Sequence, residues 1–447
     1  MLLFVQHRLF FIVIAGIAAG CTVSCNNGSH TVQDKKDSVI IPAKDTSIVI
    51  TKTDNAVRDT QAIAFNTDTT HFRLVPHHIV LQKGIELDVR IPEGYHISVA
   101  AEGLRRLRFL AKSSDGRLFA TGMYDRSDNR KGSVYIFRNW DDTAHRFLRV
   151  DTFLDHLHNP NQVAFYTKKD SSFIYVAETG QLSYYSYHAG DTVAGGSPTV
   201  IASFPDYGLS YKYGGWHLTR SLAFHNDKLY VSVGSSCNAC IEKEEVRATV
   251  LEMNPDGTGK KIFAAGLRNA VGIKFVGNQL WATSMGRDLI GPDKPEDLLL
   301  RVDKGISYHW PYYYQYQGSI YPDAQMHDSA NKQSILIPPP PPVAFAGFKA
   351  HSAPLGLDYF QDFDDPLLQN AVLVALHGST SVWRERGNEI VKVNGRNNYT
   401  PVVTGFLTGK TDNDRKGRPC DVLMNNAQSF FFTDDLHGVL YYVWKEK

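Results

Sequence analysis

A strand-turn-strand unit that recurs along the chain constrains the fold more than any other feature of this sequence. In each copy an apolar stretch leads to a turn rich in Asp, Asn or Gly and then to a strand of alternating apolar and aromatic residues. Six copies follow Ile85, at Leu107 to Met123, Gln162 to Tyr187, Ser221 to Ser235, Val271 to Met285, Leu355 to Leu376 and Asp421 to Val443. Units of about 50 residues with about four short antiparallel strands are typical of propeller blades. The sequence therefore predicts an all-β fold, a six-bladed β-propeller over residues 86–447, which explains the six long units better than a β-sandwich or a β-helix does.

The first residues of the chain predict an export signal. The apolar run from Leu9 to Ile17 follows a short basic start and is too short to cross about 30 Å of hydrocarbon. Small residues then lead to Cys21, and the sequence Ala-Ala-Gly-Cys resembles a bacterial lipobox, although Ala18 stands where Leu is commoner. We expect residues 1–20 to be a lipoprotein signal peptide and Cys21 to be lipidated. The alternatives are lipidation at Cys25 or an ordinary cleaved signal.

The segment after the signal peptide is expected to be a flexible tether, which we place at residues 21–85. From Asn26 to about Pro76 it is rich in Asp, Thr, Ser and Lys and has no sustained apolar period, so it cannot bury enough surface to offset the entropy lost on ordering. A lipid anchor and this tether would hold the propeller at a membrane of the cell envelope. Thr22, where Asp would direct retention at the inner membrane, favours the outer membrane by analogy with bacterial sorting.

Charge and cysteine content limit the kinds of ligand and metal that the protein is expected to bind. The 47 Lys and Arg residues nearly cancel the 46 Asp and Glu residues to give a net charge of +1, so no global field favours nucleic acid. Beyond the tether the only cysteines are Cys237, Cys240 and Cys420. An exported compartment permits a disulfide, and we expect one between Cys237 and Cys240. A zinc site is less well supported, because Zn²⁺ takes about four ligands and no second Cys or His pair is spaced for it.

A long connection between the fourth and fifth units contains the sequences HWPYYYQYQG and PPPPPVAF. Proline runs exclude central strands, so this connection is expected to be an irregular excursion on one rim of the propeller. Its tyrosines could form a platform on which a sugar stacks or could pack the loop onto the rim, and the sequence favours neither reading; they are Tyr312, Tyr313, Tyr314 and Tyr316.

Polar residues recur at the points where the inner strand of a blade would begin or where the second strand would end. This placement predicts side chains that face the central channel, and a channel that collects Arg and His suits an anion, because Arg forms bidentate hydrogen bonds to carboxylates. The residues concerned are His217, Arg220, Arg268, Asn269, His351, His377, Arg415 and Arg418.

At these positions the chain resembles the glucose/sorbosone dehydrogenase family from about Glu86 to its C-terminus. The stretches WHLTRSLAF, SVGSSCNAC, MNPDGTG, GLRNAVGI, QLWATSMGRD, SYHWPYYY, AHSAPLGL, VALHGS and GRPCDV follow the pattern of that family in order. The resemblance implies a six-bladed propeller that binds pyrroloquinoline quinone (PQQ), a tricarboxylate ortho-quinone, together with Ca²⁺, and that oxidises a sugar.

The resemblance also implies roles for individual residues. His217 matches the histidine that removes the proton of the sugar hydroxyl while hydride passes to PQQ. Arg268 and Asn269 match the pair that holds the cofactor and its quinone oxygens. Further cofactor contacts are implied for the basic residues Arg220, His377, Arg415 and Arg418. His377 stands where the glucose-oxidising branch has a lysine, although sorbosone-type relatives resemble this chain there.

A calcium site is implied by the same resemblance. The family takes Ca²⁺ ligands from backbone carbonyls of the turn after the fourth unit, which here are Gly286 and Arg287 in SMGRD. Arg287 places a positive charge beside the expected cation, where the glucose branch has an apolar residue, and Asp288 could offset it. Tyr308 lies in a further matching segment, whereas Trp310 is expected to be a packing residue.

The sequence thus predicts a quinoprotein oxidoreductase that oxidises a sugar, or a sugar-derived alcohol or aldehyde, with His217 as the base. Electrons would leave to a separate acceptor, because CNACI carries Ile241 where a haem-attachment CxxCH has His. One alternative is a propeller without cofactor that binds a carbohydrate or a protein. Another is a Ca²⁺-dependent lactone hydrolase, which needs acidic side chains that converge on the metal.

Overall fold

The computed structural model describes residues 64–69, 72–207, 217–379, 386–395, 398–410 and 414–446. The signal peptide, the lipidation site Cys21, its alternative Cys25 and most of the expected tether lie outside the described residues.

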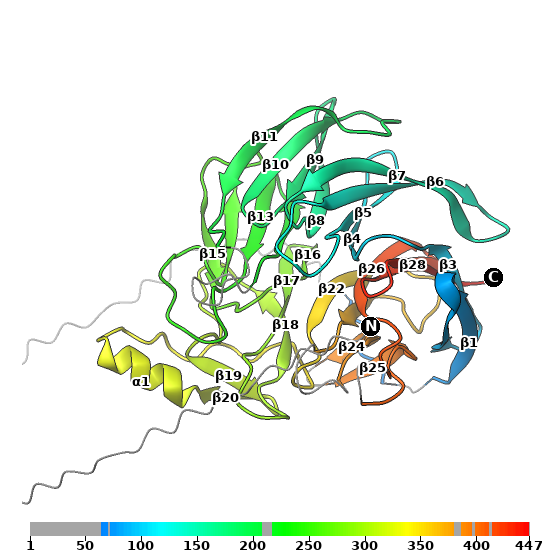
Figure 1. The fold of residues 1–447 in the computed structure, drawn as a ribbon. Coiled ribbons are helices and arrows are strands. Elements are labelled where there is room, and N and C mark those ends of the chain that lie inside the picture. The colour runs from blue at the N-terminus through cyan, green and yellow to red at the C-terminus, as the bar shows by residue number, and fades with distance from the viewer. Residues whose placement is uncertain are drawn as a thin grey trace, which may run out of the picture. The chain divides into compact units, whose positions relative to one another are not determined.

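Six four-stranded antiparallel sheets form the blades of a propeller (Figure 1). The first three blades each use four strands that are consecutive in the chain. The first blade comprises β4 (Leu107–Lys112), β5 (Leu118–Gly122), β6 (Gly132–Asp141) and β7 (Arg146–Leu157). The second comprises β8 (Gln162–Lys168), β9 (Ser171–Ala177), β10 (Gln181–Tyr187) and β11 (Gly195–Ser203). The third comprises β12 (Arg220–His225), β13 (Lys228–Val233), β14 (Thr249–Met253) and β15 (Lys261–Ala265).

The remaining three blades also have four strands each. In the fourth blade a long insertion precedes the last strand, and the last strand of the sixth blade comes from the beginning of the propeller. The fourth comprises β16 (Ile273–Val276), β17 (Gln279–Ser284), β18 (Asp297–Val302) and β21 (Ala346–Phe348). The fifth comprises β22 (Pro354–Phe360), β23 (Ala371–Leu376), β24 (Glu389–Gly395) and β25 (Asn398–Val403). The sixth comprises β26 (Pro419–Asn426), β27 (Ser429–Asp434), β28 (Val439–Lys445) and β3 (Tyr95–Ala101). Because β3 precedes all other blade strands, its pairing with β28 joins the two ends of the propeller.

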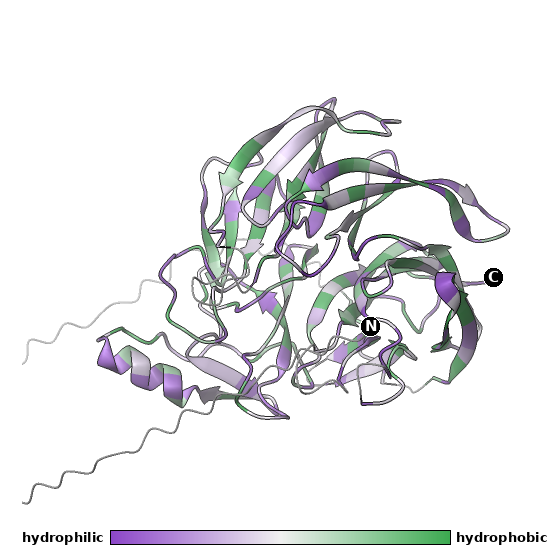
Figure 2. Cartoon of the chain, in the orientation of Figure 1, coloured by the Kyte–Doolittle hydropathy of each residue, from purple (hydrophilic) through white to green (hydrophobic). Residues whose placement is uncertain are grey.

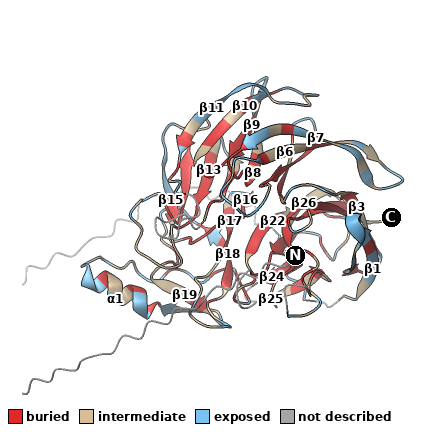
Figure 3. Cartoon of the chain, in the orientation of Figure 1, coloured by how far each residue is buried: buried red, intermediate tan, exposed pale blue. Residues whose placement is uncertain are grey.

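The first strands of the blades form a closed ring. Each of β4, β8, β12, β16, β22 and β26 contacts the first strand of both neighbouring blades, and β26 contacts β4. Apolar side chains fill the space between adjacent blades in six clusters. Figure 2 shows the apolar residues along the blade strands, and Figure 3 shows that the exposed residues gather on outer strands such as β11. The prediction of an all-β, six-bladed propeller is therefore confirmed.

Hydroxyl groups on the second strands of three blades, the first, the fourth and the sixth, each bind the neighbouring blade. Thr121 Oγ1 donates to the carbonyl of Asn161 at 2.7 Å, and Thr283 Oγ1 donates to Leu355 at 2.8 Å. Thr433 Oγ1 donates to the carbonyl of Arg108 at 2.7 Å and so links the last blade to the first. These hydroxyls also accept backbone N–H groups at 2.9–3.2 Å from their own blades; the donors are Phe109 and Asp421 in the first strands and Gly272 directly before one. Because each of these buried groups has a hydrogen-bond partner, none of them is left unsatisfied in the core.

The hairpin that precedes the propeller corrects the predicted end of the tether. Strand β1 (Leu74–Leu81), the turn η1 (Gln82–Gly84) and strand β2 (Ile85–Pro92) pair in register from Leu74–Pro92 to Leu81–Ile85. Ile79 and Leu81 are 8% and 4% exposed and join the apolar cluster of the last two blades. Residues two apart in a strand share a face, so this short alternation is enough to bury the strand. The folded part therefore begins before residue 86.

The excursion inside the fourth blade lies between β18 and β21. It contains the hairpin β19 (Tyr313–Tyr316) and β20 (Ser319–Pro322) and the helix α1 (Ala324–Lys332), which is capped by the Asp323 side chain. The Tyr313 hydroxyl donates to the carbonyl of Pro338 at 2.9 Å, and the Tyr314 and Tyr321 rings stack at 5.7 Å. These contacts lie within the excursion and correspond to the packing reading of its tyrosines. No helix among the described residues is long and apolar enough to span a membrane.

Candidate functional site

A cavity of about 440 Å³ opens at the end of the ring where the first strands begin. Its wall is formed by loops before the first strands and by residues that follow the second strands, so all six blades contribute to it. The polar residues of this wall are Arg106, Arg108, Arg126, Asn159, His217, Thr219, Arg268, Asn269, Asp288, Asp297, His351, His377, Ser379 and Arg418. The propeller thus brings together most of the site residues predicted from the sequence.

His217 lies in the loop before β12, and its hydrogen bonds fix its tautomer. Nδ1 is 2.9 Å from the backbone carbonyl oxygen of Ser235. A carbonyl can only accept, so Nδ1 carries the hydrogen and Nε2 carries the lone pair. Burial and, next, the Arg268 guanidinium lower the pKa of His217 to about 3. At neutral pH His217 is therefore an uncharged imidazole whose basic nitrogen is Nε2.

Arg268 is 4% exposed, and its guanidinium binds Asn238 and Asp288. Its Nε donates to the backbone oxygen of Asn238 at 2.9 Å, and its Nη2 donates to Asn238 Oδ1 at 2.9 Å. The Asp288 carboxylate lies 3.5 Å from the same Nη2. Burial lowers the pKa of Arg268 and the Asp288 charge opposes this effect, so the guanidinium remains a cation at the cavity wall.

Gly234 allows both His217 and Asn269 to pack closely against its backbone. A Cβ at Gly234 would lie 2.5 Å from the Cβ of His217 and 2.8 Å from Asn269 Oδ1. The His217 Cβ is fixed by its own backbone and cannot give way at 2.5 Å, so this position requires glycine. The glycine of the SVGSS stretch therefore leaves room for the expected base and the expected cofactor-binding amide against the same backbone position.

His377, Arg418 and Asp435 form a buried network at the other side of the cavity wall. Arg418 donates from Nη2 to His377 Nδ1 at 2.8 Å, and His377 Nε2 donates to Asp435 Oδ1 at 2.8 Å. Asp435 also pairs with Arg106 at 3.1 Å and with Arg108 at 2.9 Å. Both ring nitrogens of His377 are thus engaged inside the protein, and neither is placed to bind a ligand as the sequence predicted.

Arg418 retains one donor that the network does not use. Its Nη1 is buried and has no hydrogen-bond partner among the described residues, although the whole residue is 2% exposed and lines the cavity. Burial lowers the pKa of Arg418 to about 9, which leaves the guanidinium charged at neutral pH. A buried cationic donor without an acceptor fits an anionic ligand such as a cofactor carboxylate.

The turn expected to bind Ca²⁺ follows β17 and is held by Asp297. The two oxygens of this buried carboxyl group accept the backbone N–H groups of Gly286 and Ala353, each at 2.8 Å. Burial raises the pKa of Asp297 to about 6. Among the hydrogen bonds of the described residues, the carbonyl oxygens of Gly286 and Arg287 accept none. Gly286, Asp288 and Asp297 line the cavity, whereas Arg287 is not among its lining residues; oxygen atoms such as theirs are the ligands that Ca²⁺ prefers.

The sequence suggested that the positive charge of Arg287 would lie beside the expected Ca²⁺. In the structure this side chain binds residues of the excursion instead. Its Nε lies 2.7 Å from the carboxylate of Asp323, the residue that caps α1, and its Nη1 donates to Gln325 at 3.0 Å. Only the backbone of this residue remains as a candidate ligand.

Two other predicted cofactor residues are not among the lining residues. Arg220 donates to the backbone oxygens of His217 at 2.8 Å and Pro205 at 3.2 Å, so it braces the loop that carries His217. Arg415 donates to the backbone oxygen of Ser379 at 2.6 Å. His351 does line the cavity, and its Nε2 is 3.0 Å from the carbonyl oxygen of Gly291.

The sequence reasoning missed the contribution of the first two blades. Arg106 and Arg108 flank Leu107, the first residue of the first unit, and Asn159 precedes the second unit. These are the positions that yielded His217 and Arg268 in later blades. Extending the same rule to every blade would have found them.

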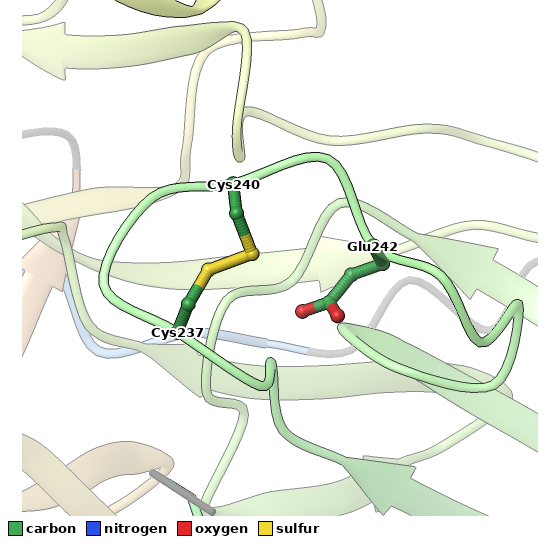
Figure 4. Close-up of side chains that lie close together, drawn as sticks. All are labelled: Cys237, Cys240 and Glu242. Carbon is green, nitrogen blue, oxygen red and sulfur yellow. A yellow bond between two sulfur atoms is a disulfide. The ribbon is translucent and has the colours of Figure 1, made fainter. Parts of the chain in front are cut away.

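The Cys237–Cys240 disulfide predicted from the sequence is present in the loop between β13 and β14 (Figure 4). Glu242 lies beside it, and its carboxylate accepts the backbone N–H of Ser236 at 2.7 Å and the Ser236 hydroxyl at 2.6 Å. With both sulfurs joined to each other, this group offers no thiolate for a metal.

No protein-family model matches this chain. A stretch of 231 residues is 29% identical to an uncharacterized protein of Borreliella burgdorferi, a match that covers 50% of this chain and 58% of that protein. The matched region thus spans little more than half the length of that relative.

Solved structures give a more extensive likeness. The holo form of the PQQ domain of pyranose dehydrogenase from Coprinopsis cinerea has a TM-score of 0.63 at 14% identity, over 80% of this chain and 97% of that one. The calcium structure of a Trichoderma reesei carbohydrate-active enzyme of family AA12 has a TM-score of 0.62 at 15% identity, over 85% and 99%. This chain has the fold of those proteins. The PQQ-bound aldose sugar dehydrogenase of Streptomyces coelicolor shares it with a TM-score of 0.51 at 15% identity, over 79% and 99%.

Proposed function

We propose that this protein is a PQQ-dependent oxidoreductase that acts on a sugar or on a sugar-derived alcohol or aldehyde. The observation that carries the proposal is the cavity at the end of the channel, where a neutral histidine and five arginines meet. Two solved proteins with the same fold are named for their PQQ-bound or holo state, and both are sugar dehydrogenases. The described lining residues include only two carboxylates, so the wall suits a polyanion.

The cofactor would be held by the cationic and amide groups of the wall. Arg268 and Asn269 lie on the side of His217, and the unused Nη1 of Arg418 lies on the opposite side. When bound, PQQ supplies a two-electron acceptor and Ca²⁺ supplies a Lewis acid. The Ca²⁺ ligands would be the carbonyls of Gly286 and Arg287 with carboxylate oxygens nearby.

His217 is the proposed base. Its Nδ1–H is used by the Ser235 carbonyl, so Nε2 is the atom that accepts the proton of the substrate hydroxyl. The Ser235 bond also holds the ring in one orientation while the proton moves. Arg268 lowers the pKa of His217, so a bound anion that offsets the Arg268 charge would make His217 a stronger base.

The proposal extends to the setting of the reaction. Electrons would pass from the reduced cofactor to a separate acceptor. A lipid on Cys21 would anchor the protein in the cell envelope, at the outer membrane, with the tether between the anchor and the propeller. A cofactor-free propeller that binds a carbohydrate or a protein is the main alternative, because His377 is engaged inside the protein. A lactone hydrolase is less well supported, because arginines outnumber carboxylates at the wall.

The test is titration of the purified full-length chain with PQQ and Ca²⁺, followed by absorbance, and then dye reduction with a panel of aldoses. We expect stoichiometric binding and sugar-dependent dye reduction that is lost in His217→Ala while cofactor binding remains. Absence of binding in the high micromolar range of PQQ would overturn the proposal and favour the cofactor-free propeller.

A further inference from the structure

Asn238 lies between the two cysteines of the Cys237–Cys240 disulfide and makes five hydrogen bonds to three residues. Its backbone oxygen accepts from Arg268 Nε at 2.9 Å and from Trp310 Nε1 at 3.0 Å. Its Oδ1 accepts from Arg268 Nη2 at 2.9 Å and from the Asp288 backbone N–H at 2.8 Å. Its Nδ2 donates to the Asp288 backbone oxygen at 3.1 Å. One residue outside the cavity wall thus binds two residues of the wall.

The geometry of these bonds fixes an orientation and not only a position. Two donors of the planar Arg268 fork are taken by two oxygens of the same residue, so the guanidinium can neither rotate about its long axis nor withdraw without losing both bonds. The Asp288 backbone is held by a donor and an acceptor of one amide. The carboxylate of Asp288 is thereby kept 3.5 Å from Arg268.

The loop that carries Asn238 is itself constrained at several points. The disulfide closes the loop across Asn238 (Figure 4). Glu242 holds Ser236 by two hydrogen bonds. The Ser235 hydroxyl donates to the Cys237 carbonyl at 2.8 Å, and the Ser235 N–H donates to the Arg268 carbonyl at 2.7 Å. A group presented from so short a cross-linked loop loses little entropy when it binds its partners.

The same loop also orients the proposed base. The Ser235 carbonyl accepts from His217 Nδ1 at 2.9 Å, three residues before Asn238. His217 and Arg268 come from different blades, yet both take their orientation from residues 235–238. Any displacement of this loop changes the distance between the lone pair of the base and the cation beside it.

We propose that Asn238 is a positioning residue that, with the disulfide-closed loop around it, sets the orientation of Arg268 relative to His217 and so the affinity of the cavity for its anionic cofactor. The cofactor part of this proposal rests on the proposed function. The orientation of Arg268 does not, because the hydrogen bonds that set it are present in the protein alone.

The test compares Asn238→Ala with Asn254→Ala in the full-length chain. Asn254 lies at the opposite end of β14, where its side chain bonds to Thr258 and Lys228 in a surface turn, so this control loses similar hydrogen bonds in the same blade. We expect the dissociation constant for PQQ with Ca²⁺ to rise about 10-fold to 100-fold in Asn238→Ala, as for the loss of a hydrogen bond to a charged group, and to stay within about 2-fold in the control. If the Asn238→Ala protein does not fold, the Asn238→Ser variant is used in its place, because a serine side chain is too short to reach Arg268.

A second measurement uses the cofactor-free protein, so that a failure of the proposed function is distinguishable from a failure of this inference. Titration of His217 by NMR in histidine-labelled protein should show a higher pKa in Asn238→Ala than in wild type. The variant keeps the bond from Arg268 Nε to the backbone oxygen of residue 238 but loses the bond to Oδ1, so the guanidinium can turn about the remaining bond and repel the imidazolium less. An unchanged His217 titration would overturn the inference whether or not PQQ binds. Wild-type affinity for PQQ in Asn238→Ala would overturn its cofactor part, and absence of PQQ binding in wild type would overturn the proposed function alone.

Discussion

Arg418 donates from Nη2 to Nδ1 of His377 at 2.8 Å, and this bond decides where the imidazole carries its hydrogen. A guanidinium has no lone pair to offer, so Nδ1 must be the acceptor and Nε2 the donor, in this case to Asp435 at 2.8 Å. His377 is therefore a neutral link between a cation and a carboxylate. It joins the fifth blade to the sixth at the cavity wall instead of presenting a charge to a ligand.

We expect the stability of wild type relative to His377→Gln to fall on acidification. Burial and then Arg418 lower the pKa of His377 to about 3, whereas an unfolded histidine titrates near ~6.5. Between these values the unfolded chain binds a proton that the native state does not, so the free energy of unfolding falls by about 1.4 kcal/mol for each unit of decreasing pH. Glutamine does not titrate. Urea unfolding of both proteins at pH 5 and pH 8 measures the difference in unfolding free energy between wild type and His377→Gln. An equal difference at both pH values would contradict the assignment of His377 as a neutral buried imidazole.

Asp435 is expected to be among the most costly side chains to remove. It pairs with Arg106 and Arg108 while buried, so Asp435→Ala leaves two desolvated cations without their carboxylate. The expected loss of unfolding free energy is about 3–5 kcal/mol. Glu93→Ala is the control, since Glu93 pairs with Arg73 at the exposed surface, and it should cost less than about 1 kcal/mol. Similar losses for the two variants in urea unfolding would show that the buried network does not stabilise the fold.

Much of the fold could be predicted because each blade repeats a local pattern. The turn and second strand recur as L-x-x-T around Thr121 and Thr283, and the structure explains the threonine by its bond to the next blade. The role of β3 could not be predicted in this way. It completes the sixth blade by pairing with β28 from the other end of the chain, and no local pattern states which distant strand completes a sheet.

The candidate site could be predicted in position but not in contacts. The rule that polar residues precede each inner strand found His217, Arg268 and Arg418, all of which line the cavity. It also selected Arg220, whose side chain turns to backbone carbonyls of its own loop. Whether an arginine faces a cavity or braces a loop depends on the acceptors within its reach. Those acceptors come from distant segments, and Asn238 is one that no motif marked.

The hydroxyl links between blades predict an asymmetric effect of two conservative changes at Thr283. Thr283→Val keeps the volume of the side chain but leaves the N–H of Gly272 and the carbonyl of Leu355 without this partner. Burial of unpaired groups costs about 1–3 kcal/mol each, so we expect a loss of a few kcal/mol in unfolding free energy. Thr283→Ser keeps the hydroxyl and should lose less, about 1 kcal/mol for the missing methyl group. A Ser variant less stable than the Val variant in urea unfolding would contradict the role of the hydroxyl.

His217 and His309 offer a matched pair for a prediction about anion binding. Both have a lowered pKa, about 3 for His217 and about 4 for His309. Burial is the cause for His309, whereas for His217 the charge of Arg268 adds to burial. An anion bound against Arg268 offsets that charge, so the pKa of His217 should rise and that of His309 should stay where it is.

NMR titration of histidine-labelled protein with and without PQQ and Ca²⁺ measures both residues, with His217→Gln and His309→Gln to assign the signals. A rise confined to His217 is expected, and it would bring the base closer to the pKa at which proton transfer is efficient at neutral pH. Equal changes at both histidines would indicate a general loosening of the fold, and no change at His217 with PQQ bound would place the anion away from Arg268.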